Sequence, residues 1–158
     1  MTGRYIGSPH DFDFLIGRFD VANRRLRERH IGSNDWDEFP ATHSGWTLHD
    51  GAVSVDEIRF ASRGFSGATV RTLDRARRRW SICWVNSLKG VLEPPVHGGF
   101  DGGRGEFFGE DHDLGRPVQV RFIWSGTTTR TPQWEQAFSI DNGRTWETNW
   151  VMSFTRTD

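Results

Sequence analysis

The sequence predicts an all-β protein, a single antiparallel up-and-down β-barrel of about 8–10 strands with little helix. Segments in which apolar and polar residues alternate recur along the 158-residue chain, whereas helical periodicity is nearly absent. Clusters of Gly, Asp and Pro separate these segments at the spacing expected of consecutive hairpins. The strongest hairpin signal lies near the C-terminus, where two aromatic-rich segments flank Asn142-Gly143.

The first half of the chain contains five predicted strands. The first covers residues 15–26, and a long loop is predicted from His30 to Phe39. Asp50-Gly51 predicts a tight turn between the second and third strands. After the loop, strands are predicted at residues 42–48, 53–60, 67–73 and 79–88.

The second half of the chain continues the same pattern. Pro94 and Pro95 cannot lie in a central strand, because each proline lacks a ladder donor, so residues 93–96 are predicted to form an edge or a crossing loop. Further strands are predicted at residues 105–110, 117–124, 133–139 and 145–155. Closure into a barrel would leave none of these strands with an exposed edge, and one domain, residues 1–158, would contain them all.

Composition narrows the classes of function. The formal charge of −1 offers no electrostatic basis for binding nucleic acid or an anionic membrane. Cys83 is the only cysteine, so neither an intramolecular disulfide nor a cysteine-based metal site is expected, and the histidines lack metal-ligand spacing. The N-terminal residues lack the apolar core of a signal peptide, which favours a cytoplasmic protein. A homodimer that uses an exposed aromatic face remains an alternative.

The aromatic content predicts a small-molecule cavity. The chain has 8 Trp and 12 Phe, and a barrel of about eight strands can hold one small ligand. Alternation places most of these rings on one face of their strands, where three polar side chains could orient a ligand. A solid aromatic core is the alternative. The candidate ligand-binding residues are Trp80, Trp84, Asn86, Trp124, Trp134, Gln136, Trp146, Thr148 and Trp150.

The opposite faces of the same strands predict a different function. If they pointed inward, they would form a buried network of arginine and carboxylates able to act as general acids or bases. The protein would then be a cofactor-independent isomerase, cyclase or lyase. If they point outward, they form exterior ion pairs of little energetic weight. The candidate catalytic residues on these faces are Glu106, Arg121, Glu135 and Glu147, with Asn149 beside them.

Several motifs resemble those of a known class of barrels. The segment Asp11-Phe12-Asp13-Phe14-Leu15-Ile16-Gly17-Arg18-Phe19 resembles the Gly-x-Trp opening of lipocalin-like, or calycin, barrels, with Phe19 at the Trp position. Residues 80–84, 105–110 and 134–150 resemble a family of small bacterial proteins of unknown function with that fold. The resemblance implies a calycin barrel but names no activity.

The resemblance also bears on cofactors. Haem-binding calycins of the nitrobindin-like group ligate iron through a histidine near the C-terminus, and this chain has no histidine after His112. The resemblance therefore implies that haem does not bind at that position. We expect no cofactor and no metal.

Overall fold

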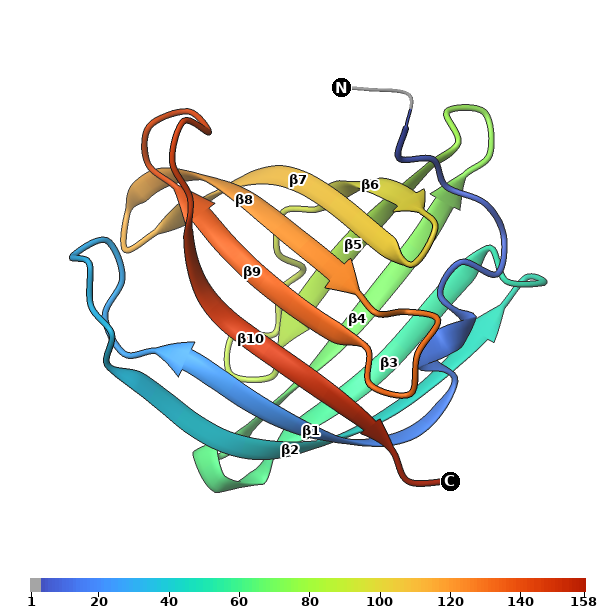
Figure 1. Cartoon of the computed structure of the whole chain (residues 1–158), viewed down its shortest axis with the longest axis horizontal. Coiled ribbons are helices and arrows are strands. Elements are labelled where there is room, and N and C mark those ends of the chain that lie inside the picture. Colours follow the sequence, from blue (N-terminus) through green and yellow to red (C-terminus); the bar gives the residue numbers. More distant parts are fainter. Residues whose placement is uncertain (1–3) are drawn as a thin grey trace.

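The computed structural model describes residues 4–158, which form a closed barrel of antiparallel strands (Figure 1). Each strand pairs with its neighbours in the chain, and β1 pairs with β10 to close the barrel. The predicted fold class is thus confirmed. The elements are η1 (Asp13–Leu15), β1 (Gly17–Leu26), β2 (Trp36–Leu48), β3 (Val53–Phe60), η2 (Ala61–Arg63), β4 (Phe65–Asp74), β5 (Arg79–Asn86), β6 (Val96–Asp101), β7 (Arg104–Asp113), β8 (Arg116–Ser125), β9 (Gln133–Ser139) and β10 (Glu147–Arg156).

Two elements differ from the sequence prediction. β2 begins at Trp36, within the predicted loop, and includes Pro40. Proline is tolerated there because pairing with β3 starts only at Thr42, so Pro40 has a neighbouring strand on one side. β6 was missed, because its two glycines look like turn residues. A Cβ built at Gly99 would overlap the backbone of Ile6, so close approach, not a turn, requires glycine there.

The C-terminal hairpin is confirmed, with a longer connection than a two-residue turn. Asn142 and Gly143 both have positive φ, as the Asn-Gly signal predicts. However, β9 ends at Ser139 and β10 begins at Glu147, so residues 140–146 form the connecting loop. This loop lies at the rim of the barrel (Figure 1).

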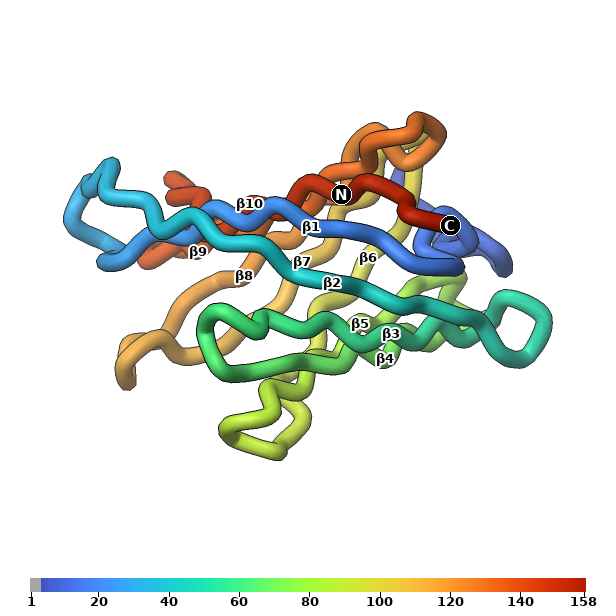
Figure 2. The backbone as a smooth tube through the Cα atoms, turned by 90° about the horizontal axis from the view of Figure 1, so that it is seen from below, coloured from blue at the N-terminus to red at the C-terminus, as the bar shows by residue number. Residues whose placement is uncertain are grey.

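The two ends of the barrel are built differently. Residues 4–16 run across one end, on the right in Figure 1, and we call it the closed end. Ile6 is bridged to Phe100 there, and η1 follows. The other end, which we call the open end, has the β1–β2, β7–β8 and β9–β10 loops. Figure 2 shows the β1–β2 loop and the N-terminal segment at opposite ends.

The closed end is a dry aromatic core. The Phe12 ring contacts Trp80 edge-on at 4.9 Å between centroids and Phe100 at 5.0 Å. Phe107 is fully buried beside them. The Trp80 indole N–H donates to the Asp11 carboxylate at 2.9 Å, so its one polar atom is satisfied.

Over residues 4–158, no helix reaches the length and apolarity needed to cross a membrane.

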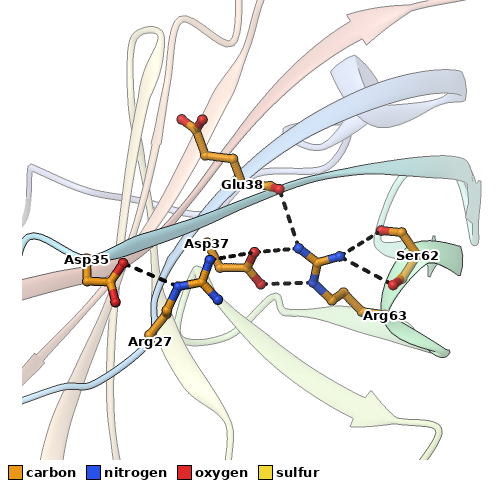
Figure 3. Close-up of polar contacts among 6 residues, drawn as sticks. All are labelled: Arg27, Asp35, Asp37, Glu38, Ser62 and Arg63. Atoms are coloured by element: carbon orange, nitrogen blue, oxygen red, sulfur yellow. Dashed lines mark hydrogen bonds and ion pairs between the residues drawn. The ribbon is translucent and has the colours of Figure 1, made fainter.

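The exterior near the open end has a network of ion pairs (Figure 3). Arg63 of η2 binds the Asp37 carboxylate through both Nε and Nη2, which lowers the pKa of that carboxyl. Arg27 contacts Asp35 at 3.3 Å and Asp37 at 3.5 Å. The network joins the β3–β4 connection to the start of β2 on the outside of the barrel.

Candidate functional site

The open half of the barrel encloses a cavity of about 330 Å³. Pockets that hold small molecules span about 300–1,000 Å³, so this one suits a small ligand. The inner aromatic faces therefore fill the barrel at its closed end and leave space at its open end. The aromatic part of the cavity wall consists of Trp84, Phe122, Trp124, Trp134, Phe138, Trp150 and Phe154.

The structure decides which strand faces point inward. Trp134 and Gln136 of β9 both line the cavity, so Glu135 between them points outward. The same alternation places Trp84 and Asn86 of β5 inside. Of the predicted ligand-binding residues, the cavity wall contains Trp84, Asn86, Trp124, Trp134, Gln136 and Trp150.

Three predicted ligand-binding residues do not line the cavity. Trp80 is at the closed end, where Phe12 and the rest of the N-terminal segment cover it. Trp146 precedes β10, and its ring contacts Arg121 at 4.7 Å, outside the cavity. Thr148 is displaced from the inner face by an irregularity in β10, which strict alternation along the strand does not anticipate.

That irregularity is a β-bulge at Asn149. Thr148 pairs with Ala137 and Trp150 pairs with Gln136, so Asn149 is the extra residue between them. As a result Asn149 and Trp150 both line the cavity. The Asn149 carbonyl oxygen accepts a hydrogen bond from the Gln136 amide at 2.8 Å, while its Nδ2 is buried without a partner among residues 4–158. No signal in the sequence marks this bulge.

The candidate catalytic residues are not brought together, and none lines the cavity. Glu106 accepts hydrogen bonds from Tyr5 and from Arg104, both at 3.0 Å. Glu147 accepts a bond at 2.8 Å from the backbone N–H of His30, which fixes the β1–β2 loop. The structure leaves Glu135 and Arg121 outside the cavity as well, since the opposite faces of their strands line it. The reacting groups of a cavity enzyme would have to be other residues.

The cavity contains a buried charged cluster that sequence analysis missed. His43, Asp56 and Arg71 lie on β2, β3 and β4, and each is nearly inaccessible to solvent. One oxygen of Asp56 accepts from Arg71 Nη2 at 2.7 Å and contacts His43 Nε2 at 3.0 Å. Arg71 Nη1 also donates to the Ser54 hydroxyl at 3.0 Å. The only sign of this cluster in the sequence is that its three residues occupy inward-facing positions of predicted strands.

The cluster keeps Asp56 ionised. Burial alone would raise the pKa of the Asp56 carboxyl, but the charge of Arg71 and the hydrogen bond from His43 hold it well below its usual range. Because a carboxylate only accepts hydrogen bonds, His43 Nε2 must bear a hydrogen. His43 Nδ1 is buried without a partner in the described part of the chain. Such a ring can orient a ligand or exchange a proton with it.

The mouth of the cavity is held by a second set of charges. Arg29 makes two hydrogen bonds to Asp113, each 2.7 Å long, and His30 contacts the same carboxylate at 2.8 Å. The hydrogen bond from Arg29 is the main cause that lowers the pKa of Asp113. These contacts tie the β1–β2 loop to the end of β7 at the rim of the cavity.

Trp150 forms part of the cavity wall and is held there by its neighbours. The Trp150 indole N–H donates to Asn23 at 2.9 Å, and its ring meets Trp134 nearly perpendicularly at 5.8 Å. The guanidinium of Arg25 lies over the Trp150 ring, 4.2 Å from its centroid. The Trp150 ring is therefore held in position by contacts within the protein.

Comparisons with known proteins do not add a family. No protein-family model matches the chain, and no curated protein matches it. Within residues 4–158, no group of three or more His, Cys, Asp or Glu side chains is placed to hold a metal ion. The function has to be inferred from the residues of the cavity itself.

Proposed function

We propose that the protein binds one small hydrophobic or aromatic molecule inside the open half of its barrel. The observation that supports this most strongly is the cavity of about 330 Å³, whose wall combines aromatic rings with polar and charged side chains. The closed antiparallel barrel is consistent with a calycin-like fold, which the resemblance in residues 11–19 implies. Binding would need little reorganisation, since Trp150 is already held by Asn23.

The polar groups of the wall would orient the ligand. Asn149 Nδ2 is a buried donor without a partner in the described residues, and a ligand oxygen would satisfy it. Its carbonyl is already occupied by Gln136, which fixes the direction of the amide. A molecule with a flat apolar body and one hydrogen-bond acceptor fits this arrangement.

Tryptophan fluorescence tests the proposal directly. We expect phenylnaphthylamine, a neutral aromatic dye, and small aromatic molecules to change the emission of the wild-type protein on titration. Trp84→Phe should weaken both the response and the affinity, because this ring lines the cavity, whereas Trp146→Phe should retain the affinity. Absence of binding by calorimetry for the dye and for the whole set of molecules would contradict the proposal.

A second candidate, a cofactor-independent isomerase, cyclase or lyase, is favoured by the buried cluster. Asp56 holds the Nε2 side of His43, which leaves Nδ1 as the nitrogen that could accept a proton from a bound carbon acid. Asn149 Nδ2 could then donate to the oxygen on which negative charge develops. The presence of these side chains in the lining of one cavity is what supports this candidate.

The ring opening of nitrobenzisoxazole tests this candidate. In that reaction a base removes the ring C–H proton, the N–O bond breaks, and a nitrile and a coloured phenolate form. We expect His43→Gln to abolish the catalysed rate while phenylnaphthylamine still binds. His97→Gln, which changes a histidine outside the cavity, should leave the rate unchanged. Equal rates for wild type and His43→Gln would remove the candidate.

A further inference from the structure

Arg25 differs from the other cationic side chains of the cavity wall. Arg29, Arg71 and Lys89 each form an ion pair with a carboxylate. Among residues 4–158, no ion pair and no side-chain hydrogen bond involves Arg25. A guanidinium that lines a cavity without a carboxylate partner can pair with a ligand instead.

The position of Arg25 is fixed by its neighbours. Arg25 follows Phe19, Val21 and Asn23 on the inner face of β1, and it pairs directly with Trp150 of β10. Its guanidinium stacks on the Trp150 ring, 4.2 Å from the centroid. The side chain is therefore held in the wall of the cavity and does not simply extend into solvent.

Stacking leaves the hydrogen-bonding edge of Arg25 free. A guanidinium uses its flat face for an aromatic ring and its edge for a carboxylate, which it binds through two parallel N–H donors. Burial first, and the neighbouring Arg29 charge second, lower the pKa of Arg25, and two nearby carboxylates do not offset them. The charge is thus incompletely compensated in the free protein, and a bound anion would compensate it.

We propose that the ligand is a small aromatic or hydrophobic anion, such as a carboxylate, whose charged group binds Arg25 at the mouth. Its apolar body would lie deeper in the cavity, against Trp150 and Trp84. This inference rests on the proposed binding function and specifies its ligand class. Asp111 and Asp113 line the same cavity, so a ligand with a single negative charge fits better than a polyanion.

The chain offers a matched control on the adjacent residue. Arg24 points to the outside of the same strand, where its guanidinium stacks on Trp36 at 4.6 Å. It also contacts Glu38 at 3.6 Å. Arg24→Gln therefore removes the same charge and the same kind of stacking as Arg25→Gln, outside the cavity.

Calorimetry with matched ligand pairs tests the inference. The pairs are benzoate with benzamide, naphthoate with naphthamide, and indole acetate with indole acetamide. In the wild-type protein we expect at least one carboxylate to bind about tenfold more tightly than its amide, as a charge-assisted hydrogen bond predicts. Arg25→Gln should abolish that preference and retain binding of the amide. Arg25→Lys should retain part of the preference, and Arg24→Gln all of it.

The outcomes separate this inference from the function on which it rests. If no carboxylate binds more tightly than its amide, or if Arg25→Gln keeps the preference, the anionic ligand is overturned while a neutral ligand remains. If neither the pairs nor phenylnaphthylamine bind to the wild-type protein, the binding function itself fails. Urea unfolding of each variant establishes that the Arg25 substitutions leave the barrel folded.

Discussion

In the barrel formed by residues 4–158, the two halves are both rich in aromatic rings, yet they differ in how those rings are packed. At the closed end the N-terminal segment inserts Phe12, whose ring contacts Trp80 and Phe100. At the open end the Arg29–Asp113 pair holds the β1–β2 loop at the rim, and a cavity of about 330 Å³ remains. Aromatic composition therefore does not determine whether a barrel is solid. In this barrel the segment that carries Phe12 packs into the closed end, where it contacts Trp80 and Phe100.

One side chain marks the boundary between the two halves. The guanidinium of Arg71 lies over the Phe12 ring at 4.9 Å and binds Asp56 in the cavity wall. Asp56 and Arg71 thus place an ion pair in the cavity wall, whereas the rings of Trp80 and Phe107 pack around Phe12 at the closed end. We infer that the closed end mainly supplies stability and the open end mainly supplies binding, and four predictions test this division.

The largest effect is expected from Phe12→Ala. It removes a fully buried ring from the closed end, and such truncations cost about 3–5 kcal/mol. Phe138→Ala at the open end should cost less, because that ring is partly exposed and faces space already present. Urea denaturation measures both variants. Equal destabilisation by the two would show that the halves do not differ as we describe.

Asp56→Asn should rank next, at about 3 kcal/mol near neutral pH, because it leaves Arg71 buried without its counter-charge. The pKa of Asp56 is held below the value of about 3.9 for an unfolded Asp, so its contribution is complete above that pH. The contribution is lost as pH falls through the folded pKa. The stability difference from wild type should therefore shrink below about pH 4. Glu57→Gln, on the exterior, should show no such trend.

Gly67→Ala should alter the cavity itself. A Cβ at Gly67 would overlap the ring of Trp84, so this indole would have to move out of its place in the cavity wall. We expect a loss of about 1–3 kcal/mol in stability and weaker binding of phenylnaphthylamine. Gly103→Ala is the control, since its nearest neighbour would be a Thr128 hydroxyl at an ordinary 3.4 Å. Unchanged dye affinity in Gly67→Ala would show that the position of the Trp84 ring does not affect binding.

The smallest effect is expected from Arg63→Ala on the exterior. This variant removes the ion pair with Asp37 in Figure 3 and the stacking on Phe39, 4.8 Å away. Exposed pairs contribute about 0.2–1 kcal/mol and weaken with salt. Denaturation at low and high ionic strength should show a small difference that declines with salt. Ligand affinity should not change.

The sequence by itself determined most of the strands, because the alternation of apolar and polar residues is a local property of each segment. It predicted a closed barrel, the C-terminal hairpin and most of the aromatic wall, including Trp84, Trp134 and Trp150. The prediction from sequence was wrong where contacts with distant parts of the chain determine the local structure. Gly99 of β6 is required by the approach of Ile6 and Gly98 by the backbone of Glu106, and no residue pattern near Asn149 indicates a bulge.

Only the tertiary structure decided which residues meet in the cavity. His43, Asp56 and Arg71 lie on three different strands. The register of β2, β3 and β4 brings His43 and Arg71 to the Asp56 carboxylate. The closure of β1 against β10 likewise stacks Arg25 on Trp150. Local periodicity sets the face on which a side chain lies. Register and closure, which depend on contacts across the whole barrel, set its partners.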